Sequence, residues 1–178
     1  IKEYFPRGFL LIYKLKKSDI SIAVNPKSGV SFTRNLLKKS KLEFRLMKIK
    51  PSQTKYQKST FFVFRNPYYR VVSMYLRLCN LIRGSRGELE SYIANKIIYR
   101  NGFQNGISFN QFLEYIDNTQ EKFRDIHYHH QYRPVSFKGI IYTENYFENL
   151  LSYSNLLDSE TFNSLRKVDI SKISKNQA

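Results

Sequence analysis

The segment Asn25–Ser31 (NPKSGVS) combines residue types suited to binding an anion. Pro26 fixes one backbone angle and lacks an N–H, while Gly29 allows a tight turn or the close approach of a ligand. Backbone N–H groups from Ser28–Ser31, followed by the start of a helix, form a receptor for a phosphate-like group. Lys27 adds a full positive charge. Taken alone, the pattern is equally typical of an ordinary turn from a strand into a helix.

A second group of basic and hydroxyl side chains occurs in RNPYYRVVS, residues 65–73. Arg65 follows an apolar run, and Pro67 suits the first turn of a helix. In that helix Arg70 and Ser73 are three residues apart and therefore share a face. An arginine and a serine hydroxyl together suit a second phosphate, because the guanidinium donates several fixed hydrogen bonds. Alone, this segment is better explained as a surface arginine and a helical serine.

All the histidines of the chain lie close together, at His127, His129 and His130. Because the pKa of histidine lies near neutral pH, they are the natural candidates for a general base. A zinc site is an alternative, but no cysteine is nearby and the spacing matches no compact motif. Packed or surface histidines explain the cluster equally well. Glu43 is a further candidate base, and equally a solvated charge.

These groups need elements to position them, and the chain alternates β-prone and amphipathic segments as an α/β protein does. Strands are predicted at 20–24, 44–49, 60–64 and 138–142, and helices at 31–39, 67–82, 88–99, 109–117 and 146–157. Ser108 with Gln111 predicts a capping box at the start of one helix. Residues 1–17 are expected to form an edge element packed on the domain, with a membrane-surface segment as the alternative. Both candidate groups follow predicted strands, where ligands bind in such sheets.

Length and charge limit the classes of protein that fit. The 178 residues suffice for one domain with a core, and no apolar run reaches the about 18 residues of a membrane span. The net charge of +16 favours an anionic partner: nucleotide, nucleic acid, acidic glycan or membrane surface. The single Cys79 excludes an internal disulfide and agrees with a reducing compartment. Because Ile1 is not a start methionine, removal of an upstream signal or anchor stays an alternative.

Together, the stretches NPKSGVSF and RNPYYRVVS resemble the two cofactor-binding signatures of sulfotransferases that use 3′-phosphoadenosine 5′-phosphosulfate (PAPS). Three later stretches, ISFNQFLEYI, DIHYHHQYRP and GIIYTENYFENLLSYSNLL, resemble blocks of the carbohydrate branch, which comprises Golgi-type enzymes and bacterial relatives. The resemblance covers about residues 20–157. Val30 stands where the first signature often has Thr, and Tyr128 where the family usually has Trp.

The resemblance implies an α/β fold: a P-loop-NTPase-like three-layer domain with a small, mostly parallel sheet flanked by helices. One sulfotransferase domain is expected over residues 1–178, with a core at about 18–157 and a polar, basic segment at 158–178. The 5′-phosphosulfate would be held mainly by backbone N–H groups of Ser28, Gly29, Val30 and Ser31. Arg65 and Ser73 would hold the 3′-phosphate.

The resemblance also implies a mechanism that needs no metal. Lys27 would neutralise the charge that develops on the leaving phosphate oxygen, and His127 would be the base for the acceptor hydroxyl. The acceptor would be a glycan or another hydroxyl-bearing molecule, acidic ones included, with no nucleic acid partner and no transmembrane segment in this chain. A bacterial-type cytoplasmic enzyme is expected, or a Golgi-lumen enzyme if an N-terminal anchor has been removed.

Two other classes of protein stay open. Charge and aromatic content also suit a basic nucleic-acid-binding protein without catalysis, although no recognised motif is present. A nucleotide kinase of related fold is disfavoured, because Lys27 precedes Gly29 whereas the Walker lysine follows the last glycine of its loop.

Overall fold

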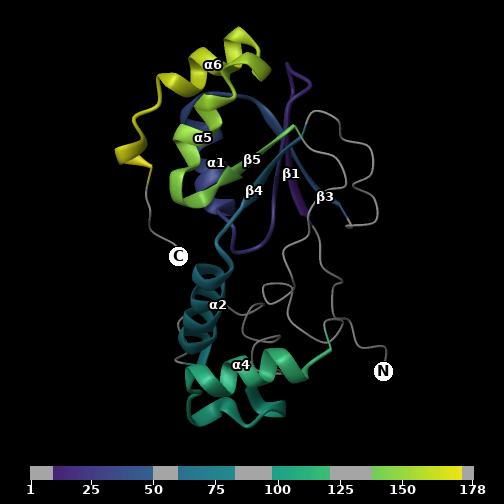
Figure 1. Ribbon diagram of the computed structural model, residues 1–178, viewed down its shortest axis with the longest axis vertical. Coiled ribbons are helices and arrows are strands. Elements are labelled where there is room, and N and C mark those ends of the chain that lie inside the picture. Colours follow the sequence, from purple (N-terminus) through teal and green to yellow (C-terminus); the bar gives the residue numbers. More distant parts are fainter. Residues whose placement is uncertain (1–9, 50–59, 83–97, 121–137, 174–178) are drawn as a thin grey trace. The chain divides into compact units, whose positions relative to one another are not determined.

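The computed structural model describes residues 10–49, 60–82, 98–120 and 138–173. The chain divides into two compact units. The sheet unit comprises Gly8–Asn66 and Gln131–Ala178, and the helical unit comprises Ile1–Arg7 and Pro67–His130. We describe each unit by itself (Figure 1).

The described residues of the sheet unit form five strands in the order β3-β1-β2-β4-β5. Their bounds are β1 Leu10–Leu15, β2 Ser21–Val24, β3 Phe44–Ile49, β4 Thr60–Phe64 and β5 Gly139–Tyr142. Strands β2, β4 and β5 pair in parallel, whereas β1 pairs antiparallel with both β2 and β3. Four strands therefore point in one direction and β1 alone is reversed, which confirms the α/β class with a mostly parallel sheet.

Strand β1 corrects the prediction for the N-terminal segment. Residues 1–17 were expected to form an edge element, but β1 lies between β3 and β2. Its sequence LLIYKL is apolar at consecutive positions, so both of its faces can be buried, as is typical of an interior strand. Ile12 packs on one face of the sheet and Tyr13 on the other. Both side chains are almost fully buried.

One face of the sheet is covered by α1 (Val30–Lys39), α5 (Tyr146–Ser152) and α6 (Ser159–Arg166) (Figure 1). Helix α1 buries Thr33, Leu36 and Leu37, which share one face of the helix at spacings of three and four residues. A short 3₁₀ helix, η6 (Ser154–Leu156), follows α5, so the helix predicted at 146–157 ends early. The other face of the sheet carries an apolar cluster of Leu10, Ile12, Ala23 and Phe62. None of the helices that the structure describes in this unit contributes a residue to that cluster.

Helix α6 lies in the region expected to be only a polar, basic segment. Asp158 caps it by accepting a hydrogen bond from the Thr161 N–H at 2.8 Å. Thr161 and Leu165, four residues apart, are both buried. The short amphipathic face explains the helix, because this spacing places the two side chains together toward the sheet unit's core.

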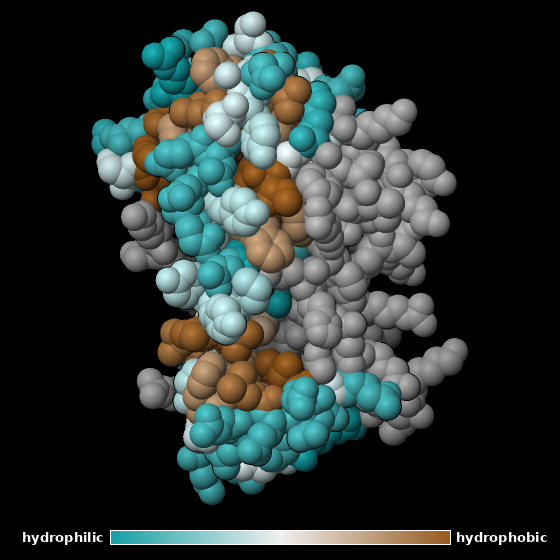
Figure 2. All heavy atoms as spheres, in the orientation of Figure 1, coloured by the Kyte–Doolittle hydropathy of each residue, from teal (hydrophilic) through white to brown (hydrophobic). Residues whose placement is uncertain are grey.

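The helical unit contains α2 (Pro67–Ile82), the 3₁₀ helix η2 (Phe103–Asn105) and α4 (Phe109–Asn118). Most of the helix predicted at 88–99 lies outside the described residues. The predicted capping box is confirmed: the Gln111 N–H donates to Ser108 Oγ at 3.2 Å, and the Ser108 N–H donates to Gln111 Oε1 at 2.8 Å. Figure 2 shows hydrophilic residues over α4 and hydrophobic residues where α2 lies, and α2 exposes Tyr68, Tyr69, Val72 and Leu76. None of the helices in the described part of the chain is long and apolar enough to cross a membrane.

Candidate functional site

The segment Asn25–Ser31 comprises a tight loop, Asn25–Gly29, between β2 and α1, followed by the first two residues of α1. The side chains of Asn25 and Ser28 are fully buried, whereas that of Lys27 is only half-buried. Gly29 is the N-cap of α1 with φ 89°, in the left-handed region that favours glycine. A Cβ at Gly29 would also stand 3.3 Å from Thr143 Cγ2. The loop therefore requires glycine at this position.

The segment after β4 meets this loop directly. Strands β2 and β4 pair in parallel, with Val24 opposite Val63, so their carboxyl ends lie at one edge of the sheet. Arg65 Nη1 donates to the backbone carbonyl of Lys27 at 3.1 Å. Lys27 itself has φ 64°, a backbone conformation that is uncommon for a residue other than glycine. Two candidate residues 38 positions apart are thus in contact.

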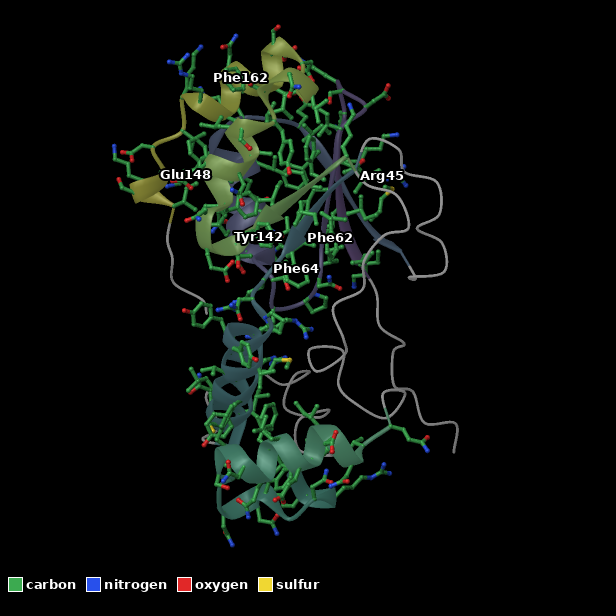
Figure 3. The ribbon with its side chains drawn as sticks, viewed as in Figure 1. Arg45, Phe62, Phe64, Tyr142, Glu148 and Phe162 are labelled. Atoms are coloured by element: carbon green, nitrogen blue, oxygen red, sulfur yellow. The ribbon has the colours of Figure 1, made fainter. Side chains whose placement is uncertain are left out.

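A third loop, η5 (Thr143–Asn145), reaches the same edge after β5. The Asn66 N–H donates to Glu144 Oε1 at 3.1 Å, so Glu144 organises the segment that follows β4. Partial burial lowers the pKa of Arg65, and the Glu144 carboxylate opposes this change. Arg65 stays charged, because an arginine guanidinium does not lose its proton in proteins. Phe64 and Tyr142, at the ends of β4 and β5, lie side by side at this edge (Figure 3), with ring centroids 6.1 Å apart.

Three hydroxyl groups that the sequence did not single out contact the start of α1. Thr33 Oγ1 donates to the Gly29 carbonyl at 2.9 Å and lies 2.9 Å from the Tyr146 hydroxyl. The Tyr13 hydroxyl donates to the Val30 carbonyl at 3.2 Å. Thr33 had a local signal, because threonine in a helix bonds the carbonyl four residues earlier. Tyr13 in β1 and Tyr146 in α5 had no local sequence signal for their contacts with α1.

The structure does not place the other predicted site residues, Ser73 and the three histidines, at this loop. Ser73 lies in α2, in the helical unit, with Arg70 on the same buried face. Its Oγ is buried and makes no hydrogen bond within the part of the chain that the structure describes. His127, His129 and His130 lie outside the described residues. Across the described ranges, no three His, Cys, Asp or Glu side chains gather in a way that could hold a metal ion.

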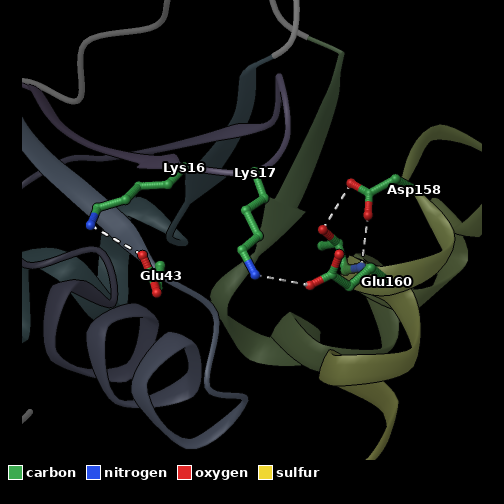
Figure 4. A network of polar contacts seen from close by, with 6 residues as sticks. Lys16, Lys17, Glu43, Asp158 and Glu160 are labelled. Carbon is green, nitrogen blue, oxygen red and sulfur yellow. Dashed lines mark hydrogen bonds and ion pairs between the residues drawn. The ribbon is translucent and has the colours of Figure 1, made fainter.

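Glu43 lies away from this edge, because it precedes β3, which runs in the same direction as β2. Its carboxylate pairs with Lys16 at 3.1 Å (Figure 4). The hydrogen bond and charge of Lys16 lower the pKa of Glu43, which is fully exposed. The alternative of a solvated charge is therefore favoured over that of a catalytic base.

The fold and the site define an α/β protein in which the loop that carries Lys27 lies beyond the carboxyl ends of the parallel strands β2 and β4, where ligands bind in such sheets. A family model described as the sulfotransferase family matches residues 10–175, which is nearly the whole chain. The chain therefore belongs to the sulfotransferase family, and it is a transferase of sulfuryl groups. Searches of curated proteins and of solved structures each found no significant match.

Proposed function

We propose that the protein transfers the sulfuryl group of PAPS to a hydroxyl of an acceptor, with carbohydrates as the acceptor class. The observation that carries this proposal is the contact between Arg65 Nη1 and the Lys27 carbonyl. This contact joins the two segments that resemble the two PAPS signatures. The family match over residues 10–175 supports the same reaction.

In the proposed reaction the acceptor oxygen attacks sulfur, forming a new S–O bond as the bond from sulfur to the 5′-phosphate oxygen breaks. Backbone N–H groups of Gly29, Val30 and Ser31 are proposed to bind the 5′-phosphosulfate. The N–H of Ser28, the fourth residue expected to take part, already donates to the Asn25 carbonyl at 3.0 Å. Lys27 neutralises the charge that accumulates on the departing phosphate oxygen. The products are the sulfated acceptor and 3′-phosphoadenosine 5′-phosphate (PAP).

Arg65 and Ser73 are proposed to bind the 3′-phosphate. The half-buried guanidinium of Arg65 supports this role, because a partly desolvated cation interacts more strongly with an anion. The buried Ser73 hydroxyl supports it as well, since it has no other hydrogen bond within the described residues. A buried hydroxyl without a partner is costly unless a ligand satisfies it.

We propose His127 as the base that accepts the proton of the acceptor hydroxyl. A histidine base must be neutral, so kcat/KM should rise with pH as the imidazole loses its proton. That rise should be absent in His127→Ala and retained in the control variant His130→Ala. An identical pH–rate profile in His127→Ala and the wild type would exclude this role.

A thermal-shift comparison tests the cofactor and separates the three candidate functions. PAP at 100 times its Kd should stabilise the protein by about 2.7 kcal/mol, which corresponds to a rise in Tm of roughly 5–10 °C. ATP and a mixed-sequence oligonucleotide should each give a much smaller shift. Stabilisation by ATP alone would favour a nucleotide kinase, and stabilisation by the oligonucleotide alone would favour a nucleic-acid-binding protein.

The net charge of +16 supports an acidic glycan among the possible acceptors, because it attracts polyanions. The single cysteine supports a reducing compartment, as expected for a bacterial-type enzyme.

A further inference from the structure

The Gly29 carbonyl is held by two donors from one residue of α1. The Thr33 N–H donates to it at 2.8 Å, and Thr33 Oγ1 donates to it at 2.9 Å. Thr33 is completely buried, so water does not compete for these bonds. Thr33 therefore fixes the orientation of the peptide group that joins Gly29 to Val30.

The direction of the next hydrogen bond follows from counting protons. A hydroxyl carries one proton, and that of Thr33 is donated to the Gly29 carbonyl. The Tyr146 hydroxyl, 2.9 Å from Thr33 Oγ1, must therefore be the donor to it. Burial raises the pKa of Tyr146, so its hydroxyl keeps the proton that this bond requires.

The next peptide group is held in a similar way. The Tyr13 hydroxyl donates to the Val30 carbonyl at 3.2 Å. Burial raises the pKa of Tyr13, so this hydroxyl also stays protonated. Two successive carbonyls at the start of α1 thus receive support from elements distant in the sequence, β1 and α5.

Fixing a carbonyl also fixes an N–H, because the two groups point in opposite directions across a planar trans peptide. The bonds to the Gly29 carbonyl orient the Val30 N–H, and the bond to the Val30 carbonyl orients the Ser31 N–H. Both N–H groups belong to the first turn of α1, where no intrahelical acceptor is available to them.

We propose that Tyr146, acting through Thr33, and Tyr13 are positioning residues that preset the Val30 and Ser31 N–H groups for the 5′-phosphosulfate. This inference rests on the proposed function, since it takes the bound anion to be that of PAPS. Donors held in place before binding improve affinity, because less conformational entropy is lost when the ligand arrives.

The test measures Kd for PAP by calorimetry in Tyr146→Phe and Thr33→Val. Each variant should bind PAP about tenfold more weakly than the wild type. The double variant should be no weaker than the weaker single variant, because both changes break the same relay. Tyr13→Phe removes the other support and should also weaken binding.

Tyr153→Phe is the matched control. Its hydroxyl bonds to the backbone of Ile140 at 3.1–3.2 Å, and its ring packs on Phe61, in the same core but away from the loop. This variant should bind PAP like the wild type. Adenosine 3′-monophosphate is the control ligand: it lacks the 5′-phosphate, so its affinity should be unchanged in every variant.

The outcomes separate the inference from the proposed function. Absence of PAP binding by the wild type would overturn the proposed function and, with it, this inference. Wild-type binding together with unchanged affinity in Tyr146→Phe would overturn the inference alone. An equal loss of affinity for adenosine 3′-monophosphate would also overturn it, since that result indicates general loss of structure. If Thr33→Val does not fold, Tyr146→Phe, which removes a single hydroxyl, decides the question.

Discussion

Replacing Lys27 by alanine is expected to lower kcat for sulfuryl transfer by a factor of about 10²–10³ while the protein stays folded. The lysine is proposed to neutralise charge that develops only as the bond to the phosphate oxygen breaks. Its loss should therefore reduce kcat far more than it raises KM for PAPS. Steady-state kinetics with PAPS and a hydroxyl acceptor measure both constants.

Lys41→Ala provides a matched control for the Lys27 variant. Lys41 also has a positive φ, of 58°, and it is exposed at the opposite end of α1 from the loop. The two variants lose the same charge from the same unusual backbone conformation, so a difference in kcat reports the position of the lysine. Turnover near the wild-type value in Lys27→Ala would contradict the mechanism.

Replacing Arg65 by alanine is expected to weaken PAP binding by a factor of about 10–100. The side chain donates to the Lys27 carbonyl, and we propose that it also binds the 3′-phosphate. Calorimetric titration with PAP measures the loss. Arg45→Ala is the control, because Arg45 is an exposed arginine on β3 (Figure 3).

A second ligand separates the two contributions of Arg65. Adenosine 5′-monophosphate lacks the 3′-phosphate, so it reports only the support that Arg65 gives to the loop. If Arg65 binds the 3′-phosphate, Arg65→Ala should lose more affinity for PAP than for adenosine 5′-monophosphate. Equal losses for the two nucleotides would restrict Arg65 to supporting the Lys27 backbone, and no loss for either would remove both roles.

The features predicted correctly from the sequence depend on residues close together in the chain. Pro67 begins α2, and Ser108 with Gln111 forms a capping box, because both signals act within one turn of helix. Strands Phe44–Ile49 and Thr60–Phe64 have the predicted bounds. The Asn25–Ser31 loop was likewise visible as a candidate, since proline, lysine and glycine mark a turn whatever lies around it.

Two elements were predicted wrongly or not at all, although their sequences carry a signal. The consecutive apolar residues of β1 fit an interior strand better than an edge strand. Asp158 precedes α6 as a typical N-cap, but the helix is short, and the basic residues at its end and beyond it resemble those of a solvated tail. In both cases burial against the sheet outweighs the weak local preference.

The sequence by itself determined which residues of this protein carry charge and hydrogen-bonding groups, and where the turns that present them begin. Only the tertiary structure decided which of these groups meet. Arg65 reaches Lys27 across 38 residues, and Tyr146 reaches Thr33 across 113. Such contacts depend on the order and direction of strands in the sheet, which no local pattern encodes, because strand pairing joins segments without regard to their separation in the chain.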